Sequence, residues 1–305
     1  MRVAITGATG FVGRWLNEEL RAAGHEPIAP EPAFDIRRTD DIRSWLQSTT
    51  PDAIAHLAAV SFGPDARARP DEAFDINVGG TIGLLEVARA LQSPPVVLIA
   101  GSSEVYGTPS PSDLPLRETA TLAPNGPYGL SKAAQEAVGL AWAQRHDLRL
   151  VATRSFNHIG PGQRPDFVVP ALIGRLLALR AGTADRVRVG NIHVRRDLTD
   201  VRDVVRAYRL LLEGQMEGRL GRTGSVYNVG SGVSVEIGDV LARLAALVGV
   251  EPVVEVDPDL VRATDAPEIR ADTSAIEADL GWRPAIPLDR TLSDIVEAAV
   301  SAARS

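Results

Sequence analysis

The chain has 305 residues, of which 45% are hydrophobic, and a formal net charge of -7 at pH 7. This length allows one large domain or two modest ones with a buried core. The absence of cysteine excludes disulfides, thiolate metal sites and a cysteine nucleophile. The net negative charge argues against a nucleic-acid partner, and no apolar run approaches the roughly 20 residues of a membrane span. We therefore expect a soluble, cytoplasmic, globular protein with no signal peptide and no membrane partner.

Short β-branched segments alternate with Ala- and Leu-rich amphipathic segments through the first half of the chain. Strands are predicted at residues 2–6, 25–30, 53–59, 96–102 and 149–155, and helices at residues 12–24, 81–93 and 132–146. The second strand is the weakest prediction because it is short and contains Pro27 and Pro30. This alternation predicts an α/β fold, a Rossmann-type doubly wound parallel sheet with helices on both faces.

The alternation changes beyond about residue 160. There the sequence predicts helices at residues 170–182, 201–214 and 237–249, strands near 187–190 and 225–230, and a mixed tail over 280–300. We interpret residues 1–160, with returns near 190–232, as a dinucleotide-binding domain. Residues 161–189 and 233–305 are predicted to form a smaller C-terminal α/β lobe that binds the substrate.

A glycine-rich loop follows the first predicted strand and opens the first helix. Gly7, Gly10 and Gly13 lie three residues apart in "ITGATGFVGRWL". Glycine permits a tight turn, a close approach of backbone N–H groups to a pyrophosphate, and close packing of the helix on the sheet. The spacing differs from the G-x-G-x-x-G form, because the second position is Ala8 and the next glycine comes only at Gly10. In this context it predicts dinucleotide binding.

The sequence leaves the choice between NADH and NADPH open. Glu31 lies close to the place where an acidic residue binds the ribose hydroxyls of NAD. Arg14, Arg37 and Arg38 are the alternative, as partners for the 2′-phosphate of NADP, although each of them also suits a solvated surface charge.

Tyr128 and Lys132 lie four residues apart at the start of a predicted helix, directly after an Asn-Gly-Pro turn. This spacing puts both side chains on one helix face. A neighbouring ammonium stabilises a phenolate, so we expect Lys132 to lower the pKa of Tyr128 from about 10 toward the working pH. Such a tyrosine can exchange a proton with a sugar oxygen while hydride moves to or from nicotinamide.

A second polar group follows the strand predicted near residue 96. Ser102, Ser103 and Glu104 come at its carboxyl end, where open α/β sheets bind ligands. A hydroxyl at this place can hydrogen-bond the oxygen that Tyr128 protonates. A simple turn or helix-capping role is the other interpretation. For Ser103 the sequence supports the catalytic and the structural role equally.

At this point the chain resembles the extended short-chain dehydrogenases/reductases that act on nucleotide sugars. The resemblance is carried by "TGATGFVG", "HLAA", "NVGGT", "GSSEVYG", "YGLSK", "RSFNHIGPGQ" and "RRDLTDVRDVVRA", which span almost the whole chain in the family's order. It implies that Tyr128 is the catalytic acid/base, with Lys132, Ser102 and Glu104 beside it, and that the cofactor is NADPH or NADH. The implied cofactor contacts are Gly7, Thr9, Gly10, Phe11, Val12, Gly13, Asp35, Ile36, Leu57, Ala58, Ala59 and Lys132.

The segments "RSFNHIGPGQRPDFVVP" and "DPDLVRATDAPEIRADTSAIEADLGW" are similar to the GDP-mannose-type members of this group. That similarity implies a GDP-sugar substrate. The implied substrate contacts are Ser103, Asn157, Val168, Arg175, Arg196, Arg262 and Asp265. Guanidinium groups suit diphosphate oxygens, although intramolecular ion pairs explain the same arginines equally well.

Two activities of this subgroup compete. One is reduction of the C4 keto group of GDP-4-keto-6-deoxy-D-mannose to GDP-D-rhamnose, with Tyr128 as general acid, and "FNHIGPGQ" with "PDFV" favours it. The other is GDP-mannose 4,6-dehydration, which needs a carboxylate such as Glu104 to remove a proton. Another nucleotide-sugar 4-epimerase or dehydratase is a further alternative. None of these needs a metal.

A different class, a non-catalytic dinucleotide sensor, is disfavoured because Tyr128, Lys132 and Ser102 are all present. By resemblance we expect a homodimer through the helices that follow Asn77 and begin near Tyr128. A tetramer is the alternative.

Overall fold

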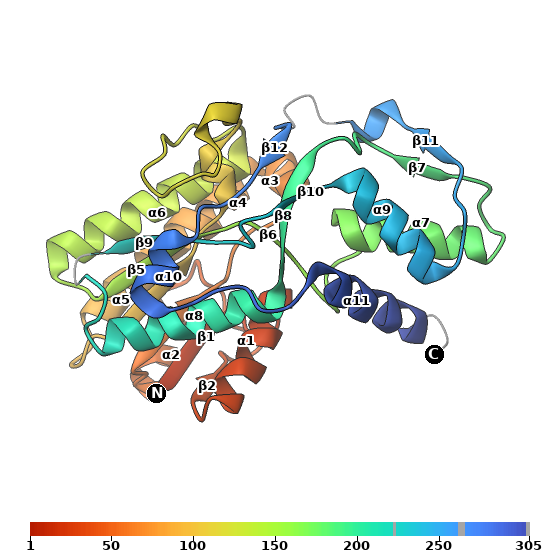
Figure 1. Cartoon of the computed structure of the whole chain (residues 1–305). Helices are drawn as coiled ribbons and strands as arrows, with labels where there is room; N and C mark the ends of the chain where they lie inside the picture. Colours follow the sequence, from red (N-terminus) through yellow and green to blue (C-terminus); the bar gives the residue numbers. More distant parts are fainter. Residues whose placement is uncertain (222–223, 262–265, 303–305) are drawn as a thin grey trace.

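The computed structural model describes residues 1–221, 224–261 and 266–302. Six strands form one parallel sheet in the order β2-β1-β3-β4-β5-β9 (Figure 1). The strands are β1 (Arg2–Thr6), β2 (Glu26–Ile28), β3 (Ala53–His56), β4 (Val96–Ala100), β5 (Leu150–Ser155) and β9 (Ser225–Val229). From β1 the chain moves to one side for β2 and to the other for β3, so the strand order reverses between β1 and β3. Open α/β sheets bind ligands at the carboxyl ends of the strands beside such a reversal.

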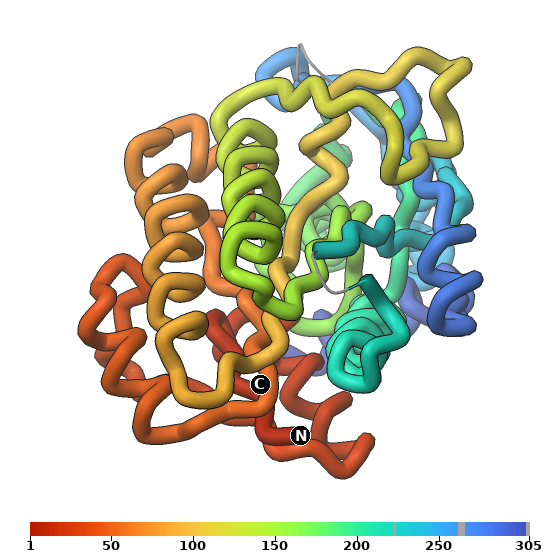
Figure 2. Tube along the Cα trace, turned by 90° about the vertical axis from the view of Figure 1, so that its left-hand side faces the viewer, coloured from red at the N-terminus to blue at the C-terminus, as the bar shows by residue number. Residues whose placement is uncertain are grey.

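Helices cover both faces of this sheet. The helices α1 (Phe11–Ala22) and α8 (Val201–Met216) cover one face, and α2 (Thr39–Thr49), α5 (Gly80–Arg89) and α6 (Pro127–His146) cover the other. Figure 2 shows α5 and α6 side by side along the outside of the molecule. Side chains of β1 alternate between the two cores: Val3 and Ile5 pack with α1, and Ala4 packs on the opposite face. Burial on both faces explains the continuous apolar runs of these strands.

A second, smaller part carries its own sheet and core. Its strands are β6 (Asn157–Ile159), β8 (Arg195–Asp200), β10 (Ser234–Glu236) and β12 (Glu268–Ile269), with β10 antiparallel to β8 and the other two parallel to it. A separate parallel pair joins β7 (Val187–Val189) to β11 (Val254–Val256). The helices α7 (Val168–Arg180), α9 (Ile237–Val248) and α11 (Leu288–Ala302) bury a core of their own. Figure 1 shows this part beside the carboxyl edge of the main sheet.

Shorter elements connect these parts. They are α3 (Gly63–Ala68), α4 (Pro70–Phe74), a π-helical turn over Asp75–Gly79, α10 (Ser274–Leu280), and 3₁₀ turns at Ser103–Tyr106, Pro111–Asp113 and Pro258–Leu260. The sequence analysis did not predict α2. Within the described residues, no helix combines the length and the apolar composition needed to cross a membrane.

The tail of the chain divides between the two parts. The predicted boundary assigned residues 233–305 to the smaller lobe, but α10 packs on β9 and α8. Ile276 and Trp282 lie in the core of the main sheet, where the Trp282 indole donates a hydrogen bond to the Asp203 carbonyl at 3.1 Å. The binding roles assigned to the two parts stay predictions.

Candidate active site

The glycine loop joins the carboxyl end of β1 to α1. Gly7 has a φ of 73°, and a Cβ atom on it would lie 2.9 Å from the Ala58 nitrogen. A Cβ atom on Gly13 would lie 2.2 Å from the Gly7 carbonyl oxygen, so only glycine lets α1 begin this close to the loop. The helix α1 lies wholly within the described residues, and its start at Gly10 has neither a side-chain cap nor an acidic residue in the first turn. The helix therefore presents its N–H groups and its positive dipole end to an anion.

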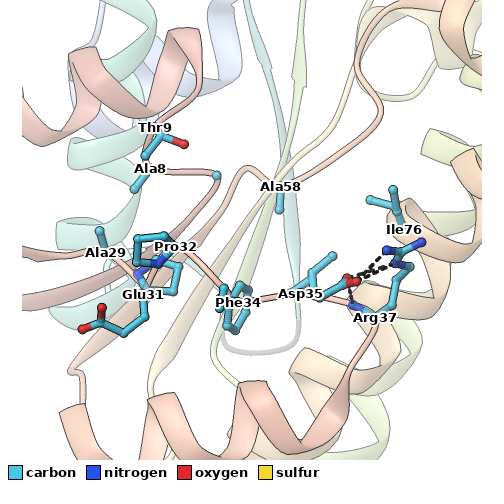
Figure 3. Close-up of a pocket in the computed structure, with 14 residues that line it drawn as sticks. Ala8, Thr9, Ala29, Glu31, Pro32, Phe34, Asp35, Arg37, Ala58 and Ile76 are labelled. Atoms are coloured by element: carbon cyan, nitrogen blue, oxygen red, sulfur yellow. Dashed lines mark hydrogen bonds and ion pairs between the residues drawn. The ribbon is translucent and has the colours of Figure 1, made fainter.

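A pocket of ≈ 540 Å³ opens beside this loop (Figure 3). Figure 3 shows Ala8 and Thr9 on one side of it, Asp35 and Arg37 on the other, and Ala58 between them. Five of the predicted cofactor residues line the pocket: Gly7, Thr9, Asp35, Ile36 and Ala58. Of the other predicted contacts, Gly10 caps α1, Phe11, Val12 and Gly13 form its first turn, and Leu57 and Ala59 flank Ala58. The structure thus places the predicted contacts other than Lys132 at the start of α1, at the end of β3 or in the pocket wall between β2 and α2.

The sequence analysis missed part of the pocket wall. Ala29, Pro30, Pro32, Ala33, Phe34 and Ile76 also line it. Most of these residues belong to the turn after β2, whose path depends on packing. The edge-to-face contact of Phe34 with Trp45 on α2, at 5.2 Å between ring centroids, is one such contact. In the sequence, the visible signal for this part of the pocket wall was the proline-containing turn after the weak second strand.

Tyr128 lies in the first turn of α6, beside the residues that follow β4. A Cβ atom on Gly129 would lie 2.8 Å from the Glu104 carbonyl oxygen, so glycine allows α6 to start against the Ser103–Tyr106 turn. Ser102 is buried, its Oγ accepts the Glu104 N–H at 3.2 Å, and its side chain is hydrogen-bonded to Tyr128. The structure therefore brings together the predicted Tyr128, Ser102 and Glu104. Ser103 is buried next to them.

The electrostatics of Tyr128 differ from the expectation. Burial raises the pKa of its phenol well above the ordinary value of 10.0, and the charges of Glu104 and Tyr208 add to this, while the hydrogen bond from Ser102 opposes it. We expected Lys132 to lower this pKa directly. The Lys132 ammonium instead donates to the Ala100 carbonyl at 2.9 Å and to Gln135 Oε1 at 2.8 Å. Tyr128 is thus a protonated phenol at neutral pH.

Lys132 is itself almost completely buried. Burial lowers its pKa to about 7 from the ordinary value of 10.5, because a charge inside the protein loses its hydration. Two of its three N–H groups have acceptors in the hydrogen bonds above. The ammonium therefore retains one donor for a ligand hydroxyl.

A buried chain of hydrogen bonds extends from Lys132 to the glycine loop. Gln135 Nε2 donates to Thr81 Oγ1 at 2.9 Å, and that hydroxyl donates to the Asn77 carbonyl at 2.6 Å. His56 Nε2 lies 2.9 Å from Thr81 Oγ1, and His56 Nδ1 lies 2.7 Å from Thr6 Oγ1.

The donors in this chain determine its protonation. Thr81 has already given its proton to Asn77, so His56 Nε2 must carry a proton and Nδ1 must accept one from Thr6. Burial lowers the pKa of His56 to about 3, in agreement with this neutral ring. The Thr6 oxygen accepts the N–H groups of Leu57 and Ala58, each at 3.1 Å. The network thus fixes both Lys132 and the Ala58 side of the pocket.

A second buried contact holds the start of α6. Asn77, in the π-helical turn, donates to Ser131 Oγ at 2.9 Å, and Ser131 Oγ donates to the Tyr128 carbonyl at 2.8 Å. The sequence analysis noted the "NVGGT" segment but did not single out Asn77, Ser131, Thr81 or Gln135. Asn77 and Thr81 form one local pair and Ser131 and Gln135 another, and each contact between the pairs spans 54 positions, so the packing of α5 against α6 brings them together.

Four of the predicted substrate residues lie on the smaller part of the molecule, whereas Ser103 lies beside Tyr128 on the main part. Asn157 is exposed at the start of β6, and Arg196 lies on the adjacent strand β8, where its Nη1 donates to the Ala266 carbonyl at 2.8 Å. Val168 is exposed at the start of α7, and Arg175 lies two turns further along that helix. Arg262 and Asp265 lie outside the described residues. The grouping of all seven residues into one substrate site stays a prediction. Among the described residues, no cluster of three or more His, Asp or Glu side chains is arranged to hold a metal ion.

Comparison with known proteins agrees with this geometry. The family model described as GDP-mannose 4,6 dehydratase matches residues 32–295. GDP-6-deoxy-D-mannose reductase from Pseudomonas aeruginosa is 34% identical over 299 residues, which is 97% of this chain and 96% of that protein.

Solved structures show the same fold. The structure of RMD from Pseudomonas aeruginosa complexed with NADPH matches at a TM-score of 0.91 and 32% identity, over 99% of both chains. UDP-glucose 4-epimerase from Thermus thermophilus, in complex with NAD, matches at a TM-score of 0.86 and 26% identity, over 99% of this chain and 100% of that one.

The parallel sheet, the glycine loop and these relatives define an enzyme of the extended short-chain dehydrogenase/reductase class. Within that class, the chain belongs to the GDP-mannose 4,6-dehydratase family.

Proposed function

We propose that this protein reduces the C4 keto group of GDP-4-keto-6-deoxy-D-mannose to GDP-D-rhamnose, with NADH or NADPH as the hydride donor. The observation that carries the proposal is the placement of the Tyr128 phenol, which is hydrogen-bonded to Ser102 beside the carboxyl end of β4. A reduction at C4 needs an acid at this place. The similarity to GDP-6-deoxy-D-mannose reductase over almost the whole of both chains supports the same choice.

The residues around the glycine loop fit a nicotinamide dinucleotide. The uncapped start of α1 and the close approach at Gly7 and Gly13 suit a pyrophosphate. The neighbouring pocket, lined by Asp35, Ile36 and Ala58, has the size and the mixed lining of a nucleoside site. The bound nicotinamide supplies the hydride. Lys132, near the end of β4, has one N–H left to hold a ribose hydroxyl.

The side chains then divide the proton chemistry between them. Tyr128 donates its proton to the C4 oxygen as that oxygen gains negative charge. Ser102 hydrogen-bonds the phenol in this structure, and with the sugar bound its single hydroxyl proton would be given to the C4 oxygen instead. A phenol at its ordinary pKa of 10.0 is protonated throughout the neutral range, and the raised pKa of Tyr128 leaves it so, which makes Tyr128 available as the proton donor.

A second candidate is dehydration of GDP-mannose, or another 4-epimerase or dehydratase reaction of the same family. The observation that favours dehydration is the position of Glu104, whose charge is close enough to raise the pKa of Tyr128. A carboxylate at that place can remove a proton from C5. The variant Glu104→Gln separates the two candidates. A reductase should keep most of its turnover, whereas a dehydratase should lose about 10²-fold or more.

The test uses the purified protein and two substrates. GDP-4-keto-6-deoxy-D-mannose is incubated with NADH or NADPH, and cofactor oxidation is followed together with the product. A GDP-deoxyhexose formed as the cofactor is oxidised supports the reductase. If neither cofactor is oxidised, while GDP-mannose yields a 4-keto sugar without net oxidation of added cofactor, the protein is the dehydratase.

We further propose that the GDP-sugar binds through Ser103 on the main part together with Asn157, Val168, Arg175, Arg196, Arg262 and Asp265. Arginine side chains on β8 and α7 would provide the forked donors that a diphosphate needs. The variant Arg196→Gln should raise the KM for the sugar nucleotide while leaving NADH affinity unchanged. An unchanged KM would remove Arg196 from the site.

The same proposal includes a homodimer through α5 and α6, or a tetramer built from two such dimers. Leu130 is 47% exposed on the outward face of α6, and Ala137 and Ala141 follow it at helical spacing and are also exposed. Small and apolar residues at this spacing allow helices of two copies to pack closely. Sedimentation analysis should show a dimer that Ala141→Glu converts to monomers.

A further inference from the structure

The part of the pocket furthest from Tyr128 is rich in carboxylates. Glu31, Asp35 and Arg37 are its charged lining residues, so the three together carry one net negative charge. Glu31 follows β2, is exposed, and lines the pocket on the side of Ala29 and Pro32 (Figure 3). A ligand bound here meets one acidic group that no lining cation balances.

Sheet topology identifies which half of a dinucleotide this pocket receives. In the order β2-β1-β3-β4, the pocket lies at the ends of β2, β1 and β3, whereas Lys132 contacts Ala100 at the end of β4. Tyr128 and Ser102 also belong to the β4 side. A pyrophosphate at the start of α1 lies between these two places. A dinucleotide bound this way would direct its nicotinamide half toward β4 and place its adenosine half in the pocket beside Glu31.

The cation of the pocket is already engaged. Arg37 Nε lies 2.9 Å from Asp35 Oδ1, its Nη2 lies 2.5 Å from Asp35 Oδ2, and the Arg37 backbone N–H donates to Asp35 Oδ1 at 3.0 Å. This contact lowers the pKa of Asp35 to about 2, so the pair stays charged at any working pH. Figure 3 shows the Arg37 guanidinium directed onto the Asp35 carboxylate.

The other two arginines considered for a 2′-phosphate also have protein acceptors. Arg38 Nε lies 3.6 Å from Asp41 Oδ1, and its side chain is 69% exposed. Arg14 Nη2 donates to the Gly162 carbonyl at 3.0 Å, and neither arginine is among the residues that line the pocket. A phosphate here would meet Arg37 only through the guanidinium donors that Asp35 does not use, with the carboxylates of Asp35 and Glu31 in the same pocket wall.

We infer that this pocket selects NADH over NADPH, with Glu31 as the residue that determines the specificity. A carboxylate accepts hydrogen bonds from the free hydroxyls of an adenosine ribose, and it repels a phosphate placed on the same ribose. The inference rests on the cofactor site of the proposed function. It separates this chain from its structural relative RMD, which was solved with NADPH.

Direct binding tests the inference without catalysis. The dissociation constants of NADH and NADPH are measured by calorimetry on the purified protein, with no sugar substrate present. The inference predicts that NADH binds at least about tenfold more tightly. The variant Glu31→Gln keeps the side-chain size and should narrow this ratio through tighter NADPH binding. Asp35→Asn removes the carboxylate that pairs with Arg37, so this variant should also bind NADPH more tightly than the parent protein does.

Glu26→Gln is the matched control. Glu26 lies on β2, the strand that precedes Glu31, but outside the pocket, and it pairs with Arg2 at 3.4 Å. Glu26→Gln changes the net charge by the same amount as Glu31→Gln. The ratio of the dissociation constants of NADH and NADPH should nevertheless stay that of the parent protein. Equal or tighter binding of NADPH by the parent protein would overturn the inference, and so would an unchanged ratio in Glu31→Gln. If neither dinucleotide bound, the result would refute the proposed cofactor site and therefore also the proposed selectivity.

Discussion

The Lys132 ammonium lies 2.8 Å from the side-chain oxygen of Gln135. Ala100 on β4, Thr81 on α5 and Asn77 in the π-helical turn hold this pair in place. Gln135 must direct its nitrogen toward Thr81, since that hydroxyl has given its own proton to the Asn77 carbonyl. Its oxygen therefore faces Lys132. An exposed lysine would sample many positions, whereas here two acceptors hold the ammonium with one donor left over.

Replacing Thr81 by Val tests this network. The change keeps the shape but removes an acceptor shared by His56 and Gln135, so two buried N–H groups lose their partner. We expect the free energy of unfolding to fall by about 1–3 kcal/mol and NADH affinity to weaken. Thr81→Ser restores the hydroxyl and should recover most of both quantities. Urea unfolding and calorimetry measure them, and a Thr81→Val protein as stable as the parent would contradict the network.

Tyr128→Phe tests the general acid. Without a proton donor at C4, kcat should fall by about 10²–10⁴-fold, while NADH should bind as in the parent protein. Tyr227→Phe is the control. Tyr227 lies on β9, away from the site, and its hydroxyl donates to Asp279 at 2.6 Å. That variant should keep its turnover. Wild-type turnover by Tyr128→Phe would refute the assignment.

The pH dependence of stability reports on Lys132. Its folded pKa is about 7 and its unfolded value is near 10.5, so between these values the unfolded chain holds a proton that the folded chain lacks. The free energy of unfolding should therefore rise with pH across this window, and the full cost of the buried charge is present below about pH 7.

Lys132→Met removes this contribution, so its stability relative to the parent should decrease as pH rises from 7 to 10. The total change is at most about 5 kcal/mol. Urea unfolding of both proteins across this range measures it. A difference between the two proteins that does not vary with pH would show that Lys132 keeps an ordinary pKa.

The glycine loop provides a matched pair of variants. Gly13→Ala puts a Cβ atom 2.2 Å from the Gly7 oxygen, so the loop must move and dinucleotide affinity should fall by about tenfold or more. In Gly174→Ala on α7, the new Cβ atom meets nothing within 4 Å. That variant should bind NADH normally and gain about 0.5–1 kcal/mol of stability, because alanine favours a helix. Equal NADH affinity in the two variants would contradict the loop's role.

Much of the fold could be predicted from local patterns. Strands such as Val96–Ala100 are buried on both faces, so they are uniformly apolar in the sequence, and each precedes a turn rich in glycine or serine. Gly7 and Gly13 could be predicted for the same reason, since a loop between a strand and a helix allows few residues at its closest contacts. The weak strand at Pro27 did prove to be short.

The remaining features depend on contacts between distant residues. The helix α2 carries many polar residues, and its amphipathic pattern was missed. The direction of the Lys132 side chain is set by Ala100 and Gln135, so helical spacing alone suggested a contact with Tyr128 that the folded chain does not use. Asn77 reaches Ser131 across 54 positions. No local sequence pattern encodes such a contact.

The most direct test of the proposed reduction follows the hydride itself. The protein is incubated with GDP-4-keto-6-deoxy-D-mannose and NADH that carries deuterium at both hydrogens of the nicotinamide C4, and the product is examined by mass spectrometry and NMR. The account predicts a GDP-deoxyhexose with one deuterium at C4 of the sugar. An unlabelled product, or no product from either NADH or NADPH, would contradict it.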